Sequence, residues 1–141
     1  MKQSAAVIVS AILCATLSGC GDGGASSPAT PPVPKEVVKI SAGQLFAAYE
    51  DNEVATDERL KGKIVEVSGT VQAIDKDAFD NILINLKTSN QFMPAHMKMD
   101  DGEKAKAIAL KKGAKVAIQC QKMIRMIGTP YGSDCQFVSG G

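Results

Sequence analysis

The sequence predicts a small, mainly β domain with two helices: a five-stranded barrel that follows an N-terminal helix and carries a second helix between its third and fourth strands. Three observations lead to this prediction. Apolar and polar residues alternate with a period of two in several runs after residue 63. A glycine interrupts the longest run, and a helical pattern separates the third run from the fourth. The predicted domain covers residues 36–141, enough for one small core.

The first 19 residues have the composition of an export signal peptide. Lys2 supplies a positive charge, and an apolar run over residues 5–17 leads into Ser18-Gly19-Cys20. This ending resembles the signal of bacterial lipoproteins, in which the chain is cut before a cysteine that then carries lipid. Two alternatives stay open. A permanent transmembrane helix needs about 20 apolar residues, more than this run offers, and secretion without lipid needs only the small residues before the cut.

Lipid on Cys20 predicts attachment to a membrane. Each buried methylene contributes about 0.8 kcal/mol, so two or more acyl chains give a stable anchor. The next residue is Gly21 and not aspartate, which resembles Gram-negative lipoproteins that are released toward the outer membrane. We therefore expect a lipid-anchored protein of the bacterial cell envelope, facing the periplasm, with the outer membrane favoured over the inner.

Residues 20–35 predict the lipidated cysteine and a flexible tether. After Cys20 the segment is rich in glycine, serine and proline and has almost no large apolar side chain. Such a segment buries too little surface to offset its conformational entropy, so it serves as a spacer.

An N-terminal helix is predicted to begin at Ser41. Ser41 and Gln44 have the spacing of a capping box, and Ile40 and Leu45 have that of a hydrophobic staple. The aromatic residues that follow share one side of the helix and are expected to pack in the core. Residues 53–60 predict another short helical turn, with Asn52 as its cap.

Three strands are then predicted. Residues 63–74 alternate, and Gly69 in their middle predicts a bulge or a sharp coil that lets one strand serve two parts of a barrel. Residues 81–87 form the next strand, after a loop over 75–80. Residues 91–99 form the third. Pro94 cannot donate a backbone hydrogen bond, so this strand is expected to lie at an edge or to bulge there.

The remaining elements complete the barrel. Asp100 and Glu103 repeat the capping spacing, and Gly113 stands where a helix end tolerates a positive φ. A strand follows over residues 115–126, then a turn at 128–130 and a last strand over 131–138. The order strand, strand, strand, helix, strand, strand is that of the OB fold, a five-stranded partly open barrel.

Two segments carry a family resemblance. Residues 53–57 (Glu-Val-Ala-Thr-Asp) and 60–71, with the pattern Lys-Gly-Lys followed by Val-x-Gly-x-Val, resemble the tRNA-anticodon-like OB-fold domain family of bacterial lipoproteins. The resemblance extends over about residues 39–138 and includes two late cysteines. It implies an OB fold and, through that fold, single-stranded nucleic acid as a ligand class. It brings no catalytic residues.

Cysteine usage fits an exported protein. Cys14 leaves with the signal peptide and Cys20 is the lipidation site, which leaves Cys120 and Cys135 as an even pair in an oxidising compartment. A structural disulfide is favoured, while two buried thiols or a redox-active pair stay open, although no Cys-x-x-Cys motif is present. We expect no metal and no cofactor, because His96 is the sole histidine and too few ligands for zinc remain.

Charge and side-chain chemistry favour a binding role over catalysis. The chain has 16 basic and 15 acidic side chains, and loss of Lys2 brings them into balance, so nothing predicts a global affinity for polyanions. Three acidic residues of one loop suggest calcium but lack the EF-hand pattern, so a solvated loop is favoured: Asp75, Asp77 and Asp80. No nucleophile and base are recognisable, so we expect no enzyme.

A ligand groove is predicted on the third strand, where OB folds bind oligonucleotides and oligosaccharides. The candidate groove residues are Phe92, His96, Lys98, Lys122 and Arg125. Ordinary surface or edge packing of these side chains is the alternative. The sequence thus favours a non-catalytic envelope binding module for a protein, peptide or glycan, with single-stranded nucleic acid as the alternative ligand.

Overall fold

The computed structural model describes residues 33–139, so the predicted signal peptide, most of the tether and the lipidation site Cys20 lie outside the described residues. The elements are β1 (Val37–Ser41), α1 (Ala42–Asp51), α2 (Glu53–Leu60), β2 (Ile64–Lys76), β3 (Ile82–Leu86), β4 (Ala95–Met99), a 3-10 turn (Asp101–Glu103), α3 (Lys104–Ala109), β5 (Lys115–Met126) and β6 (Thr129–Phe137).

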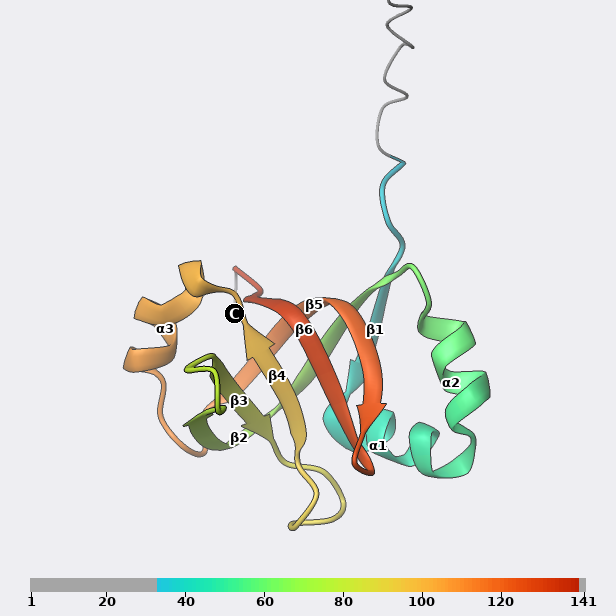
Figure 1. Ribbon diagram of the computed structural model, residues 1–141, viewed down its shortest axis with the longest axis horizontal. Helices are drawn as coiled ribbons and strands as arrows, with labels where there is room; N and C mark the ends of the chain where they lie inside the picture. The colour runs from blue at the N-terminus through green and yellow to red at the C-terminus, as the bar shows by residue number, and fades with distance from the viewer. Residues whose placement is uncertain (1–32, 140–141) are drawn as a thin grey trace, which may run out of the picture. The chain divides into compact units, whose positions relative to one another are not determined.

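Five strands close into the predicted barrel. The order is β2-β3-β4-β6-β5, and β5 returns to pair with β2. The first half of β2 pairs with β5 and the second half with β3, because one long, coiled strand serves both neighbours. Figure 1 shows β4 between β3 and β6 at the front of the barrel, with α3 at one side and α1 and α2 at the other. This is the OB-type fold.

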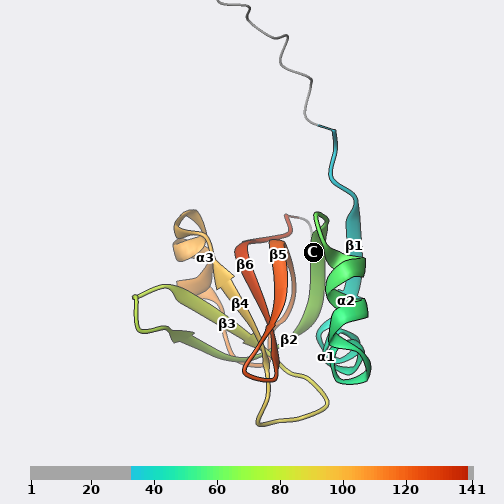
Figure 2. The same cartoon turned by 45° about the vertical axis from the view of Figure 1, so that its right-hand side comes forward.

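A sixth strand, β1, lies outside the five-stranded barrel and is absent from the sequence-based prediction. It runs parallel to β2, with Val37 opposite Ile64 and Ser41 opposite Ser68. Figure 2 shows β1 beside α1 and α2. The five residues of β1, Val-Val-Lys-Ile-Ser, do not alternate regularly between apolar and polar, so periodicity does not mark them as a strand. Their partner lies 27 positions away in the chain, which local periodicity cannot reveal.

The predicted N-terminal cap is present. Ser41 Oγ accepts a hydrogen bond from the Gln44 backbone N–H at 3.3 Å, and the Gln44 side chain accepts one from the Ser41 N–H at 3.2 Å. Leu45 and Tyr49 of α1 are buried against the barrel. The segment predicted as a short turn is a full helix, α2, whose cap Asn52 accepts from the Ala55 N–H at 3.0 Å.

The sequence predicts a bulge or a sharp coil at Gly69: β2 changes partners from β5 to β3 next to this glycine, but it has no bulge there. The register of β2 against β3 shifts between Val71 and Ala73 instead. Gly69 has a packing role, because a Cβ there would lie 3.3 Å from the Cβ atoms of both Ala42 and Leu86. The glycine therefore allows α1, β2 and β3 to approach one another closely.

The third strand is shorter than predicted and is not an edge strand. β4 begins at Ala95, so Pro94 precedes the strand and removes no ladder hydrogen bond from it. β3 flanks β4 on one side and β6 flanks it in parallel on the other. Residues 91–94 belong to the β3–β4 loop, because the turn at Asn90, where the Met93 N–H donates to the Asn90 carbonyl at 3.0 Å, keeps them out of the ladder.

The capping box predicted at Asp100 and Glu103 does not form. The Asp100 side chain accepts from Gln136 Nε2 at 2.8 Å, and the Glu103 carboxylate accepts from the Phe137 backbone N–H at 3.2 Å. Tertiary contacts to β6 thus use both side chains, and the helical segment is a 3-10 turn followed by the six-residue α3. Gly113 has a φ of +86°, but it lies three residues beyond Leu110, the C-cap of α3, and donates to the Val71 carbonyl instead of capping the helix.

The last hairpin turns one residue earlier than predicted. Ile127 and Gly128 both have positive φ, 49° and 80°, as a two-residue type I′ turn requires, and Thr129 and Pro130 already belong to β6. The expected disulfide joins the two arms of this hairpin, from Cys120 to Cys135. Within residues 33–139, no helix has the length and apolarity needed to cross a bilayer.

Candidate binding face

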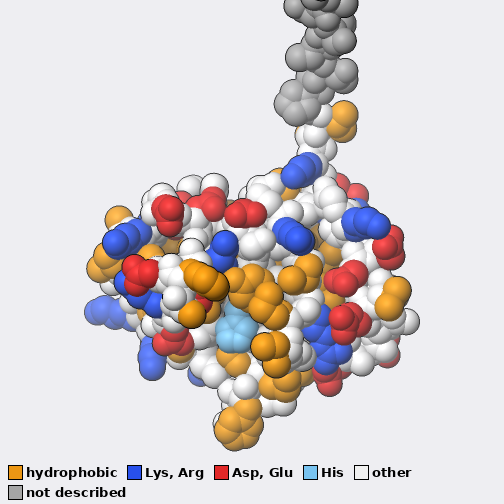
Figure 3. All heavy atoms as spheres, in the orientation of Figure 1, with side chains coloured by type: hydrophobic (Ala, Val, Ile, Leu, Met, Phe, Trp, Pro, Cys, Tyr) orange, Lys and Arg blue, Asp and Glu red, His pale blue; other side chains and the backbone are white. Residues whose placement is uncertain are grey.

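The outward side of strands β3, β4 and β6 forms one continuous surface, which we call the outer face. In β4, Ala95, Met97 and Met99 are buried in the core, so His96 and Lys98 point outward. The outer face contains, from neighbouring register positions, Leu83, Asn85, His96, Lys98, Tyr131 and Ser133. Figure 3 shows the single histidine surrounded by hydrophobic side chains on this side of the barrel.

A chain of hydrogen bonds runs from β2 through β3 to β4 on this side of the barrel. Asn85 Nδ2 donates to Asp75 Oδ2 at 2.6 Å, and Asn85 Oδ1 lies 2.6 Å from His96 Nδ1. Asn85 is 7% exposed, and both the nitrogen and the oxygen of its side-chain amide have a partner. Burial lowers the pKa of His96 below its ordinary value of 6.5, and the carboxylate of Asp75 opposes that shift. The imidazole is therefore neutral at neutral pH.

Two loops border the outer face. The β2–β3 loop is held by Asp77, whose carboxylate accepts from the Phe79 backbone N–H at 2.8 Å and from both nitrogens of Asn81. The bonds from Asn81, the largest contribution, lower the pKa of Asp77. This loop presents Phe79, 86% exposed, and the β5–β6 turn presents Ile127, 94% exposed.

The acidic side chains that suggested calcium are engaged within the protein. Asp75 binds Asn85, Asp77 holds its loop, and Asp80 pairs with Lys76 at 2.6 Å. Among residues 33–139 no group of three His, Cys, Asp or Glu side chains is placed to hold a metal ion. All three carboxylates thus bind groups of the protein itself, as expected if this acidic segment is a loop without a metal site.

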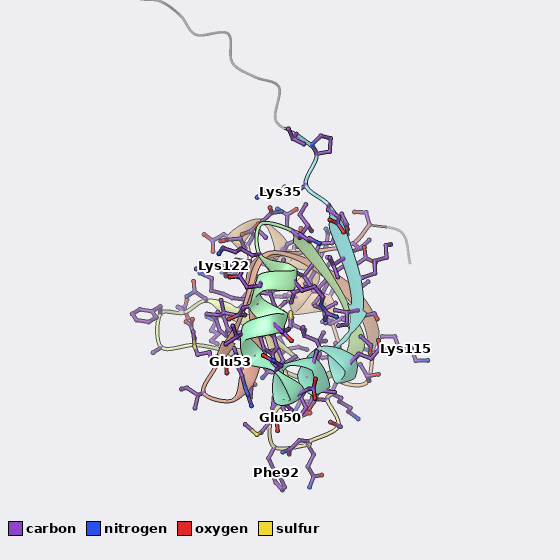
Figure 4. The ribbon with its side chains drawn as sticks, turned by 90° about the vertical axis from the view of Figure 1, so that its right-hand side faces the viewer. Lys35, Glu50, Glu53, Phe92, Lys115 and Lys122 are labelled. Atoms are coloured by element: carbon purple, nitrogen blue, oxygen red, sulfur yellow. A yellow bond between two sulfur atoms is a disulfide. The ribbon has the colours of Figure 1, made fainter. Side chains whose placement is uncertain are left out.

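The structure brings together only part of the predicted groove. His96 and Lys98 share the outer face, and Lys122 points outward from β5 opposite Ser133. The placement of Phe92 on the third strand is wrong: it lies in the β3–β4 loop, 83% exposed, beside a hollow of about 450 Å³ lined also by Gln72 and Thr88. Figure 4 shows Phe92 at the end of the domain opposite Lys35.

Arg125 is engaged by the helices and is not part of the outer face. Its guanidinium donates to the Tyr49 carbonyl at 3.1 Å and pairs with Glu50 and with Glu53, the latter at 3.5 Å. Only 20% of the side chain is exposed. Arg125 therefore fixes α1 and α2 to the end of β5. Two carboxylates already neutralise its positive charge, which would otherwise attract a phosphate.

A second hollow, of about 440 Å³, lies between β5 and α2. Its walls include Lys122 and Ile124 on β5 and Asp57, Glu58 and Leu60 on α2. Charges of both signs line it. Sequence reasoning missed this hollow, and it also missed Asn85 and Tyr131 of the outer face, because strand register brings them beside His96 and no local motif does.

The closed five-stranded barrel and its strand order define an OB-type domain. The model of the tRNA_anti-like family matches residues 3–136, so the chain belongs to the tRNA_anti-like family. Among solved structures, the chain is similar to one named as a putative nucleic acid-binding lipoprotein from Klebsiella pneumoniae, with 16% identity, a TM-score of 0.60, and coverage of 73% of this chain and 92% of that one.

Other comparisons add little. A structure of the S. pombe Stn1-Ten1 complex has 13% identity and a TM-score of 0.40 over 55% of this chain and 59% of that one. The search of curated proteins gives no match. At these identities the structural similarity shows the fold alone.

Proposed function

We propose that this protein is a non-catalytic binding module of the bacterial cell envelope, held on the outer membrane through lipid on Cys20. In this proposal residues 1–19 are the signal peptide, residues 20–35 carry the lipid and the tether, and residues 36–141 are the binding domain. A fully extended chain spans at most about 3.6 Å per residue, so the tether gives the domain a reach of about 50 Å from the membrane. The lipoprotein from Klebsiella pneumoniae with the same fold supports lipid anchoring, without indicating which membrane.

The composition of the outer face carries the choice of ligand. Around the Asp75, Asn85 and His96 chain, the face offers a neutral imidazole, partly exposed apolar side chains and one lysine on β4. The carboxylate of Asp77, in the loop that borders the face, opposes the charge of that lysine, which lowers the pKa of Asp77. Nucleic-acid binding requires clustered cations to replace counterions along the phosphates. The face therefore fits an envelope protein, peptide or glycan better than a polyanion.

Single-stranded nucleic acid is the second candidate. Two aromatic side chains favour it: Phe79 and Phe92, both more than four fifths exposed, are available for base stacking. The name of the similar Klebsiella protein points the same way. The two rings lie on separate loops, and Arg125, which sequence reasoning placed in one groove with Phe92, is bound to glutamates.

Site-specific photocrosslinking in cells tests the proposal. A photoreactive phenylalanine replaces Tyr131 on the outer face or Val54, an exposed residue of α2 that serves as the matched control. We expect crosslinks to an envelope component from position 131 and none from position 54. Equal yields from both positions contradict a ligand role for the outer face.

Two further measurements separate the remaining parts of the proposal. Metabolic labelling with an alkyne fatty acid is expected to mark the chain and to fail after Cys20→Ser. Titration of fluorescent oligo(dT) at two salt concentrations tests the second candidate, since phosphate-driven binding weakens steeply with salt. Salt-dependent binding that is lost in Lys98→Gln favours nucleic acid over the first candidate.

A further inference from the structure

The hydrogen-bonded chain on the outer face fixes the tautomer of His96. An ionised carboxylate only accepts hydrogen bonds, so Asp75 requires the Asn85 amide to present its NH₂ group, at 2.6 Å. The Asn85 Oδ1 then faces His96 Nδ1, also at 2.6 Å, and an amide oxygen only accepts. His96 must therefore carry its proton on Nδ1.

The consequence is a free acceptor on the outer face. A neutral imidazole protonated on Nδ1 has its lone pair on Nε2. Asn85 is 7% exposed and bonded at both ends of its amide, so it cannot reorient without leaving a buried polar group unpaired. The ring of His96 is half-buried, and its Nε2 is the atom of the chain left for a ligand.

The surroundings of Nε2 combine three kinds of contact. Tyr131 lies opposite His96 on β6, so an aromatic side chain adjoins the imidazole, and Ile124, opposite Tyr131 on β5, continues the apolar surface one strand further on. Lys98, two positions along β4 on the same side, supplies a hydrogen-bond donor. An acceptor, a donor and a partly exposed apolar surface thus occur within neighbouring register positions.

We propose that the outer face binds a sugar ring of an uncharged glycan, with His96 Nε2 accepting a hydrogen bond from a sugar hydroxyl. This inference rests on the proposed function and names its ligand class. A sugar carries hydroxyl donors at its edge and an apolar C–H side that can cover Tyr131. An ionised phosphate has no proton to offer Nε2. A peptide would add at a free strand edge, but β4 is paired on both sides.

Chitotetraose, an uncharged oligosaccharide, is the probe, and the protein is the full chain with Cys20→Ser, so that it carries no lipid. Side-chain ¹⁵N NMR of His96 is expected to show a protonated Nδ1 and an unprotonated Nε2. Addition of chitotetraose is expected to shift the Nε2 resonance and those of Tyr131. Binding should weaken about tenfold in His96→Phe, the loss of about 1.4 kcal/mol that a good hydrogen bond represents.

A second pair of variants keeps the histidine and changes its orientation. Asp75→Asn removes the carboxylate that orients Asn85, so a mixture of tautomers and a severalfold weaker affinity for chitotetraose are expected. Asp134→Asn is the matched control, because it removes an exposed carboxylate of β6 at a φ of 54° that asparagine accepts. It should change neither the tautomer nor the affinity.

The outcomes separate this inference from the proposed function. Absence of binding to chitotetraose, or equal binding by the parent and His96→Phe, overturns the glycan inference. If crosslinks from position 131 nevertheless reach an envelope protein, the proposed function stands without it. If neither experiment detects a ligand on the outer face, both fail.

Discussion

The disulfide between Cys120 and Cys135 gives the most quantitative prediction. The bond closes a loop with a sequence separation of 15. In the chain-entropy model a loop of this length restricts the unfolded chain by about 3 kcal/mol at 25 °C. For a domain of about 100 residues, 1 kcal/mol shifts the melting temperature by about 4–8 °C, so loss of the bond should lower it by about 12–24 °C.

Urea unfolding followed by circular dichroism measures the expected loss of about 3 kcal/mol in the free energy of unfolding. The Cys20→Ser chain is compared in its oxidised form, in its form reduced by a phosphine, and as Cys120→Ala/Cys135→Ala. Both sulfurs are fully buried, so alanine avoids placing hydroxyl groups in the core. Reduced protein with the same urea midpoint as oxidised protein would refute the reasoning. The disulfide restricts the unfolded chain whatever other contacts the folded hairpin makes, so those contacts cannot replace it.

Three further predictions concern packing, titration and capping. Gly132→Ala should destabilise the fold by about 1–3 kcal/mol, because its Cβ would lie 2.6 Å from Cys120 Sγ, whereas Gly43→Ala, with no atom within 4 Å, should be neutral or stabilise α1 by up to about 1 kcal/mol. The lowered pKa of His96 means that the unfolded chain binds the proton first as pH falls below 6.5, so stability should drop in that range and His96→Gln should drop less, in urea midpoints at pH 7 and 5. Ser41→Ala should cost about 1 kcal/mol in the same assay through loss of the helix cap, and an unchanged midpoint would contradict a role for the capping box.

Local patterns predicted most of the barrel. The alternation of residues 63–74 and of residues 115–126 predicted two strands, which the structure has as β2 and β5, and Ser41 with Gln44 predicted the start of α1. These features depend on neighbours in the chain: side-chain period in a strand and a side-chain bond within one helical turn. β1 escaped prediction because it has only five residues, and they do not alternate regularly between apolar and polar.

The candidate site was predicted less completely. His96 and Lys98 are on the same face, as the alternation of β4 required. Phe92 is in a loop and Arg125 is bound to α1 and α2, since contacts between distant segments decide both positions. The partners of His96, Asn85 on β3 and Asp75 on β2, follow from strand register, which the sequence of β4 does not contain.

The sequence by itself determined the class of domain, the helix cap and the pair of cysteines available for a disulfide, because each depends on composition or on spacing along the chain. The tertiary structure alone decided that β4 is enclosed by β3 and β6, that Arg125 is engaged by glutamates, and that His96 presents Nε2. The physical reason is that a hydrogen bond or an ion pair between segments far apart in the chain exists only once the register of the closed sheet places its two partners within reach.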